Sequence, residues 1–185
     1  MQRGDFWVFG YGSLMWMPGF DYLERRLARL DDFRRSFCLQ SWHYRGTRER
    51  PGLVLGLDWA PGASCVGVAL RICPSQDAHV RAYLAKRELV SYAYFETLYP
   101  VTLLDDGAGQ GEKREALCYI VDRTHEQYAG GLGLEQQAET ILAAAGSAGP
   151  NADYLLKTLA HLAELGIPDP ELERLGDLVR ARAAA

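Results

Sequence analysis

The feature that most constrains this 185-residue chain lies near its start, where an apolar run leads directly into a turn of small residues. The run is Phe6-Trp7-Val8-Phe9, and the turn is Gly10-Tyr11-Gly12-Ser13. This pattern predicts a short buried strand that ends in a tight turn. Because the turn holds two glycines, its backbone can approach a ligand closely and point N–H groups at it. Such a turn suits an anion or a developing oxyanion, although a Gly-Ser turn after a strand is usually only a turn.

Composition places the chain among ordinary globular proteins. Hydrophobic residues make up 48% and charged residues 24%, which is enough apolar side chain for a core and argues against disorder. The formal net charge of −4 argues against a nucleic-acid-binding protein, which normally carries a basic excess. The length fits one domain over residues 1–185, and no long linker interrupts the sequence.

Neither the cysteines nor the histidines form a metal-binding pattern. The four cysteines and four histidines include no CxxC and no pair at zinc spacing, so we expect no metal, and free buried thiols. The N-terminus lacks the basic stretch and apolar core of a signal peptide, and no window has the roughly 18 apolar residues of a membrane span. We therefore expect a soluble cytoplasmic protein without a membrane partner.

The first two-thirds of the chain are typical of short strands joined by turns. Asp31-Asp32 and Pro61-Gly62 are turn signals, and each predicts a hairpin between the apolar segments on its two sides. Residues 25–30, the segment before Asp31-Asp32, could equally form a helix. The expected strands cover residues 6–11, 25–30, 34–39, 53–58, 64–72, 99–104 and 116–121. Short strands at this spacing predict a small sheet, either open or closed into a barrel.

One helix is expected among the strands and three in the last third of the chain. The first has Ser75 as its N-cap and runs to about Glu88. The others cover residues 134–145, a segment capped by Asn151 that ends at Gly166, and residues 171–182. The glycine-rich segment 105–111 joins the last two strands, either as one wall of a cavity or as a plain solvated loop.

The motifs of several common enzyme classes are missing. The sequence has no GxxxxGK[ST] and no GxSxG, and the glycine turn is not followed by a clear helix with an acidic residue about 20 positions on, as is typical of a dinucleotide site. The expected chemistry is therefore general acid–base catalysis by a carboxylate. The candidate is Glu88, in Lys86-Arg87-Glu88, with Glu96 as the next. A glutamate in such a sequence is usually solvated, but burial would raise its pKa into the range useful for proton transfer.

A third candidate feature is the polar and aromatic segment 41–47, which joins two expected strands. Arg45 in this segment could clamp a carboxylate of a ligand. The segment could equally be an ordinary long hairpin loop.

Together these residues resemble the ChaC family of γ-glutamylcyclotransferases. The points of similarity follow the family's order along most of the chain. They are residues 7–14 with Trp16, Arg35, Phe37, Arg45-Gly46-Thr47, Pro51-Gly52, Gly67-Val68-Ala69, Tyr83-Leu84, Arg87-Glu88, Tyr128, Gly130, Ala144-Ala145-Gly146, Asn151 and Tyr154-Leu155. One such motif is a weak signal, but several in order are a strong one.

The resemblance implies an α+β, γ-glutamylcyclotransferase-like fold: a small mixed β-barrel with flanking helices, on which helices from about residue 134 pack. It also implies cleavage of glutathione to 5-oxoproline and cysteinylglycine, without cofactor or metal, with Glu88 as the catalytic residue. The matching substrate loop consists of Val8, Phe9, Gly10, Tyr11, Gly12, Ser13 and Leu14. We expect Arg45 to hold the distal part of the substrate.

Two alternatives stay open at this point, as does the oligomeric state. The segment after Glu88 lacks the Gly-Gly that many family members have, and His43-Tyr44 stands where Asp-His is common. Ser36 replaces a second arginine found in some members. The same reaction on another γ-glutamyl amide is therefore one alternative. The other is a catalytically silent binding protein, which loss of the carboxylate at position 88 would indicate; that carboxylate is present.

Overall fold

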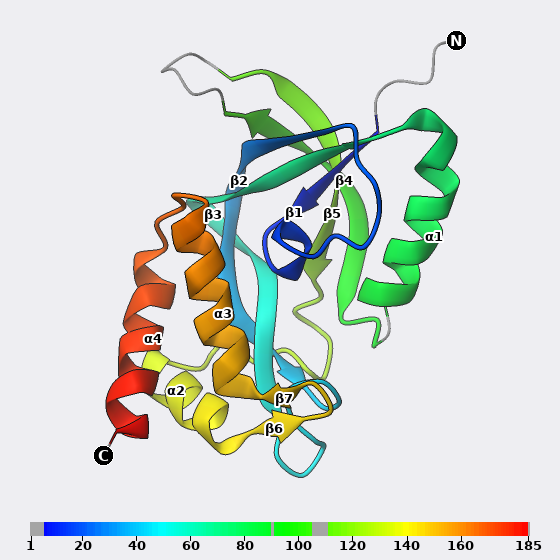
Figure 1. Ribbon diagram of the computed structural model, residues 1–185. Helices are drawn as coiled ribbons and strands as arrows, with labels where there is room; N and C mark the ends of the chain where they lie inside the picture. The colour runs from blue at the N-terminus through cyan, green and yellow to red at the C-terminus, as the bar shows by residue number, and fades with distance from the viewer. Residues whose placement is uncertain (1–5, 90, 105–110, 185) are drawn as a thin grey trace. The chain divides into compact units, whose positions relative to one another are not determined.

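The computed structural model describes residues 6–89, 91–104 and 111–184, which form a mixed α+β structure (Figure 1). Two groups of residues pack mainly among themselves. The first unit consists of Met1–Arg35 and Leu57–Asp122, and the second of Ser36–Gly56 and Arg123–Ala185. The chain passes between the units within two long strands and again after Asp122, so each unit contains segments that are distant in sequence. The single domain expected over residues 1–185 stays a prediction.

Five strands close into a barrel, as the spacing of the apolar segments predicts. They are β1 Phe6–Gly10, β2 Glu24–Ser41, β3 Gly52–Ile72, β4 Tyr94–Leu103 and β5 Lys113–Val121, in the order β1-β3-β2-β4-β5. β1 closes the barrel because it pairs antiparallel with β3 on one side and parallel with β5 on the other (Figure 1). Val8 lies opposite both Leu70 and Leu117, and all three side chains are buried.

The two hairpins expected at Asp31-Asp32 and Pro61-Gly62 are wrong. Each turn signal instead lies inside one continuous strand, β2 or β3. Asp32 has a φ of 65° and Gly62 a φ of 79°, and the Gly62 N–H donates to Asp32 Oδ1 at 2.8 Å. Asp and Gly are among the residues that tolerate this left-handed backbone. A single such residue changes the direction of a strand locally, and here the chain does not reverse.

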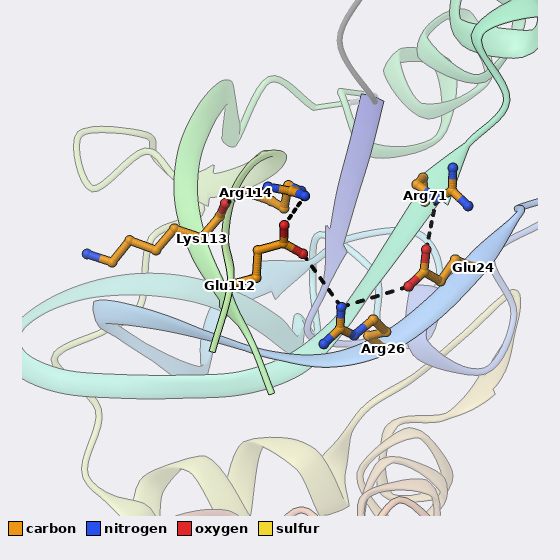
Figure 2. A network of polar contacts seen from close by, with 6 residues as sticks. All are labelled: Glu24, Arg26, Arg71, Glu112, Lys113 and Arg114. Carbon is orange, nitrogen blue, oxygen red and sulfur yellow. Dashed lines mark hydrogen bonds and ion pairs between the residues drawn. The ribbon is translucent and has the colours of Figure 1, made fainter. Parts of the chain in front are cut away.

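A network of charged side chains links strands of the first unit at one place on the barrel, as Figure 2 shows. Arg71 on β3 donates to Glu24 on β2, with 2.9 Å between Nε and Oε2. Arg26 on β2 lies 3.9 Å from Glu24 and 3.8 Å from Glu112, which also pairs with Arg114 on β5. Since β4 lies between β2 and β5 in the sheet order, Arg26 reaches past one strand. The network therefore adds cross-strand contacts to the backbone pairing.

Replacing Arg26 with methionine should lower the free energy of unfolding only slightly. The two ion pairs are long and partly solvated, so we expect a loss of about 0.5–1 kcal/mol at low ionic strength. Salt screens such pairs, and the loss should shrink at high salt. Urea unfolding of both proteins at low and high NaCl measures this difference. An equal loss at both salt concentrations would assign it to the packing of the arginine stem instead.

The second unit contains the C-terminal helices, largely as the sequence predicts. They are α2 Leu134–Ala143, α3 Asn151–Glu164 and α4 Pro170–Ala183. Asp169 caps α4, since its side chain accepts from the Leu172 N–H at 3.2 Å. The helix expected to extend to residue 145 ends at Ala143, because β6 Ala145–Gly146 pairs with β7 Gly149–Pro150. This short turn forms the connection between α2 and α3 that the sequence indicates.

The cap of α3 expected at Asn151 is wrong. The Asn151 side chain makes no capping bond and is completely buried. Instead Oδ1 accepts from the Leu53 N–H at 2.6 Å, and Nδ2 donates to the Leu53 carbonyl at 2.7 Å. A buried amide that faces a single backbone residue satisfies both of its polar groups at once. Asn151 therefore joins the start of α3 to the start of β3.

The neighbouring backbone segments approach so closely that side chains do not fit between them. A Cβ at Gly46 would lie 2.1 Å from the Gly52 nitrogen, and one at Gly146 would lie 2.6 Å from the Gly46 nitrogen. The N–H groups of Ser147 and Ala148 donate to the carbonyls of residues 43 and 44, both at 2.9 Å. These contacts fasten the turn between β6 and β7 onto the segment between β2 and β3.

Replacing Asn151 with alanine should destabilise the protein strongly, because the Leu53 N–H and carbonyl would be left buried without partners. We expect a loss of about 2–4 kcal/mol in the free energy of unfolding, measured by urea denaturation. Thr158→Ala is a suitable control. Thr158 is also a fully buried polar residue of α3, but it donates to the Tyr154 carbonyl within the helix. Equal losses in the two variants would contradict the role given to Asn151.

Two further expectations from the sequence concern the cysteines and membrane-spanning helices. All four cysteines are free, as expected; Cys38, Cys65 and Cys118 are buried, but Cys73 is partly exposed, so the expectation of a buried thiol is wrong for Cys73. None of the helices that the described residues form has both the length and the apolar character needed to cross a membrane.

Candidate active site

The predicted substrate loop follows β1 in the first unit. After Gly10 the chain turns through Tyr11 and Gly12 into a single 3-10 turn, Ser13–Met15, whose Met15 N–H donates to the Gly12 carbonyl at 2.9 Å. Of the seven predicted loop residues, Val8, Phe9, Gly10, Tyr11, Gly12 and Leu14 are buried, and Ser13 is partly exposed. Ser13 is therefore the loop side chain that combines a polar group with access to a ligand.

Close backbone packing holds this loop on the barrel. A Cβ at Gly67 would lie 2.3 Å from the Gly10 carbonyl oxygen, so only glycine fits between β3 and the end of β1. Buried Arg35 then fixes the turn, because its Nε donates to the Tyr11 carbonyl and its Nη2 donates to the Val66 carbonyl, both at 2.5 Å. The N–H groups of Ser13 and Leu14 meet no acceptor within residues 6–89, 91–104 and 111–184.

The candidate catalytic residue ends helix α1, Asp77–Glu88, also in the first unit. The expected Ser75 cap is wrong: a 3-10 turn, Pro74–Gln76, precedes the helix, and no side chain caps its start. Val80 and Leu84 are buried on one face of α1. Glu88 lies four residues after Leu84, which places it on that same face. The helical spacing therefore carries a carboxylate into partly buried surroundings.

The surroundings of Glu88 change its acidity. Its side chain is 19% exposed, and this burial raises the pKa of the carboxyl because the charged form is poorly solvated. The Arg87 guanidinium opposes part of the effect and lowers the pKa, with 3.1 Å between Nε and Oε1 of Glu88. A carboxylate with a raised pKa can both take and return a proton near neutral pH.

Arg87 brings the loop and the carboxylate together. Besides contacting Glu88, its guanidinium donates to Ser13 Oγ at 2.8 Å and to the carbonyls of Met17 and Pro18 at 2.8 and 3.0 Å. The structure thus places Ser13 and Glu88, which lie 75 positions apart in sequence, on either side of one arginine. The sequence offered only one sign of this arrangement, namely a basic residue directly before the candidate base.

A tyrosine that the sequence did not point to lies near both candidate carboxylates. Tyr119 on β5 lies directly opposite Glu96 on β4, and its hydroxyl donates to Glu96 Oε2 at 2.8 Å. Burial raises the pKa of Tyr119, and the charges of Glu96 and Glu88 raise it further. Tyr119 is therefore a hydrogen-bond donor that stays protonated beside two carboxylates. Only the fold reveals it, because β4–β5 pairing sets its register.

Arg45 belongs to the second unit. Its Nη1 donates to the carbonyls of Ala148 and Pro150 at 2.6 and 3.2 Å, and its guanidinium lies 5.3 Å from the centre of the Tyr154 ring. These contacts give Arg45 a packing role within that unit. Its expected contact with the distal part of a substrate stays a prediction.

Two further expectations concern the glycine-rich segment 105–111 and metal binding. Residues 105–110 of the glycine-rich segment lie outside the described residues, so neither interpretation of that segment is tested. Within the part of the chain that the structure describes, no three His, Cys, Asp or Glu side chains gather as a metal site requires.

The fold and the site define an α+β protein with a closed five-stranded barrel and a partly buried carboxylate that Arg87 links to the predicted substrate loop, residues 8–14, called the glycine loop below. The family model described as ChaC-like protein matches residues 6–182, and the chain belongs to this family. It is 34% identical over 174 residues to the glutathione-specific γ-glutamylcyclotransferase of Escherichia coli strain K12, covering 94% of this chain and 72% of that protein. It is also 34% identical to γ-glutamylcyclotransferase 2-3 of Arabidopsis thaliana, covering 94% of this chain and 88% of that protein.

A solved structure supports the fold. The crystal structure of a yeast γ-glutamyl cyclotransferase specific to glutathione superimposes with a TM-score of 0.87 and covers 97% of both chains. The two sequences are 24% identical in this alignment, so the likeness concerns the fold alone. It confirms the expected γ-glutamylcyclotransferase-like architecture.

Proposed function

We propose that this protein is a γ-glutamylcyclotransferase that cleaves glutathione to 5-oxoproline and cysteinylglycine. The observation that carries the proposal is the position of Glu88, a partly buried carboxylate with a raised pKa that contacts Arg87, which also donates to Ser13 of the glycine loop. Membership of the ChaC-like family and the glutathione-specific activity named for the Escherichia coli relative support the choice of substrate. The cytoplasmic location expected from the sequence stays a prediction.

The proposed reaction is intramolecular. The α-amine of the γ-glutamyl group attacks the carbonyl carbon of the γ-amide, a new C–N bond closes the five-membered ring, and the bond to the cysteine nitrogen breaks. Since the substrate supplies both reacting groups, the enzyme contributes mainly by holding them in the geometry for attack. Correct orientation alone can be worth about 7–11 kcal/mol of the barrier.

Glu88 is proposed to carry the proton in this reaction. An α-amino group is mostly protonated near neutral pH, because its pKa is about 8, and it must lose a proton before it can attack. The neutral amine loses one further proton as the new C–N bond forms, and Glu88 accepts this proton as a base and then donates it as an acid to the departing cysteine nitrogen. Burial favours the acceptance of the proton, because a carboxylate with a raised pKa is a stronger base.

The glycine loop is proposed to stabilise the charge that develops on the carbonyl oxygen. The N–H groups of Ser13 and Leu14, together with the Ser13 hydroxyl, are the donors that the loop offers. Arg35 and the close packing at Gly67 hold the backbone that carries them. Donors that are fixed before the reaction starts cost no reorganisation when the charge appears.

The central test is the formation of 5-oxoproline, measured by mass spectrometry after incubation with millimolar reduced glutathione. The wild-type protein should form the product, and Glu88→Gln should lower kcat/KM by about 10²–10⁴-fold, because it cannot accept a proton. Wild-type kcat/KM should fall as the pH drops through the raised pKa of Glu88. Glu96→Gln is the matched control and should keep most of the activity. The reverse result for these two variants would move the base to Glu96, and an inactive wild-type protein would contradict the proposed substrate.

Glu88→Gln should also change stability in a pH-dependent way. Because the pKa of Glu88 is raised in the folded protein, the folded state binds more protons than the unfolded state between the two pKa values. Wild-type stability therefore decreases as the pH rises through this window, and the glutamine variant lacks that decrease. The variant should gain stability relative to wild type from pH 4 towards neutral pH, as measured by urea unfolding at a series of pH values. A difference that stays constant with pH would contradict the burial of Glu88.

A further inference from the structure

We infer that Arg87 is a positioning residue that holds the loop and the base of the proposed cyclotransferase in one fixed arrangement. The inference rests on the proposed function, and it assigns to a neighbour of Glu88 a task that neither Glu88 nor the loop can perform alone. Arg87 itself need not touch the substrate. It acts on Ser13 from one side and on Glu88 from the other.

The geometry of the guanidinium carries this inference. All three of its nitrogen atoms are in use: Nε faces Glu88, Nη2 donates to Ser13 Oγ, and Nη1 donates to the carbonyls of Met17 and Pro18. Nη1 also lies 3.1 Å from the hydroxyl of Tyr83, one turn earlier on α1. The Arg87 side chain is 18% exposed, and its contacts with Pro18, Tyr83 and Ser13 are partly buried. A surface arginine that merely solvates a helix end would not be saturated in this way.

The segment that follows the glycine loop packs directly against α1. Gly19 has a φ of +80°, and a Cβ there would lie 2.0 Å from the Tyr83 hydroxyl oxygen. The Phe20 ring lies edge-on to the Tyr83 ring, with 6.0 Å between their centres. The segment that follows the loop therefore rests directly on α1, and Arg87 bonds to both partners of this contact.

The contacts explain why the residue is an arginine. A guanidinium is planar and presents five N–H groups in a rigid fork, so it can reach acceptors in several directions at once. A lysine has one compact ammonium group, which carries the same charge but cannot keep contacts with Glu88, Ser13 and two carbonyls simultaneously. Lysine at position 87 would thus separate the effect of the charge from the effect of the fork.

The charge of Arg87 has its own consequence for the base. Glu88 is faced by Arg87 from its own helix and by Tyr119 from β5, and Tyr119 in turn interacts with Glu96 on β4 and Arg81 on α1. Arg87 keeps part of the Glu88 population ionised against the effect of burial. Removing the charge should therefore raise the pKa of Glu88, and the fraction of active base at a given pH should fall.

The test compares Arg87→Met, Arg87→Lys and the control Lys86→Met. Lys86 is the exposed neighbour on α1, so its replacement removes the same charge from the same helical turn. Two quantities are measured in each protein. One is the pKa of the Glu88 carboxyl, from ¹³C NMR titration of glutamate-labelled protein, with Glu88→Gln used for assignment. The other is the pH profile of kcat/KM for glutathione.

In Arg87→Met the Glu88 pKa and the acid limb of kcat/KM should both move to higher pH, and the plateau should fall about 10- to 100-fold because the loop is displaced. In Arg87→Lys the limb should stay near that of wild type while the plateau still falls. Lys86→Met should match wild type in both. An unchanged Glu88 pKa and plateau in Arg87→Met, or an equal shift in Lys86→Met, would overturn the inference. If the Glu88 pKa shifts in Arg87→Met but the wild-type protein does not turn over glutathione, the proposed function alone would be rejected.

Discussion

The structure of the first unit depends on β1 being paired along both of its sides. Antiparallel pairing with β3 and parallel pairing with β5 close the barrel, and they leave the end of β1 no freedom to shift along its neighbours. The turn that follows Gly10 inherits this fixed position. The glycine loop is thus a rigid extension of the barrel, and Arg35 and Gly67 complete the restraint from β2 and β3. A site that has to place N–H donors with precision gains from such a foundation.

The sequence predicts the barrel, the helical last third and the two halves of the candidate site, because these depend on local patterns. The apolar run before Gly10 and the helical spacing from Leu84 to Glu88 are visible without any partner. What it could not predict depends on contacts between distant residues. Asp31-Asp32 and Pro61-Gly62 match the pattern of turns, because the same residue types adopt a left-handed backbone where the chain reverses and where a strand only bends. Asn151, Tyr119 and Arg87 acquire their partners only through tertiary packing.

The contacts of Glu88 reflect a compromise between opposing demands. A deeply buried carboxylate without a partner would stay protonated and could not act as a base, whereas a strongly paired one would remain ionised and could not return the proton. Partial burial and one adjacent guanidinium push the pKa in opposite directions. The same arginine is used to hold the loop, so electrostatics and geometry at this site are adjusted by a single side chain.

The glycines and the asparagine of the second unit bear on how the chain reaches its folded state. Asn151 forms hydrogen bonds with the backbone of Leu53, which lies 98 residues earlier. The turn between β6 and β7 packs against the segment between β2 and β3, more than 90 positions before it. Contacts between such distant residues are formed late, because closing a long loop costs entropy before it is rewarded. During synthesis, the segment between β2 and β3 can form these contacts only after the start of α3 has left the ribosome. All residues of the first unit lie at or before Asp122, so the part that carries Glu88 is synthesised before the second unit is complete.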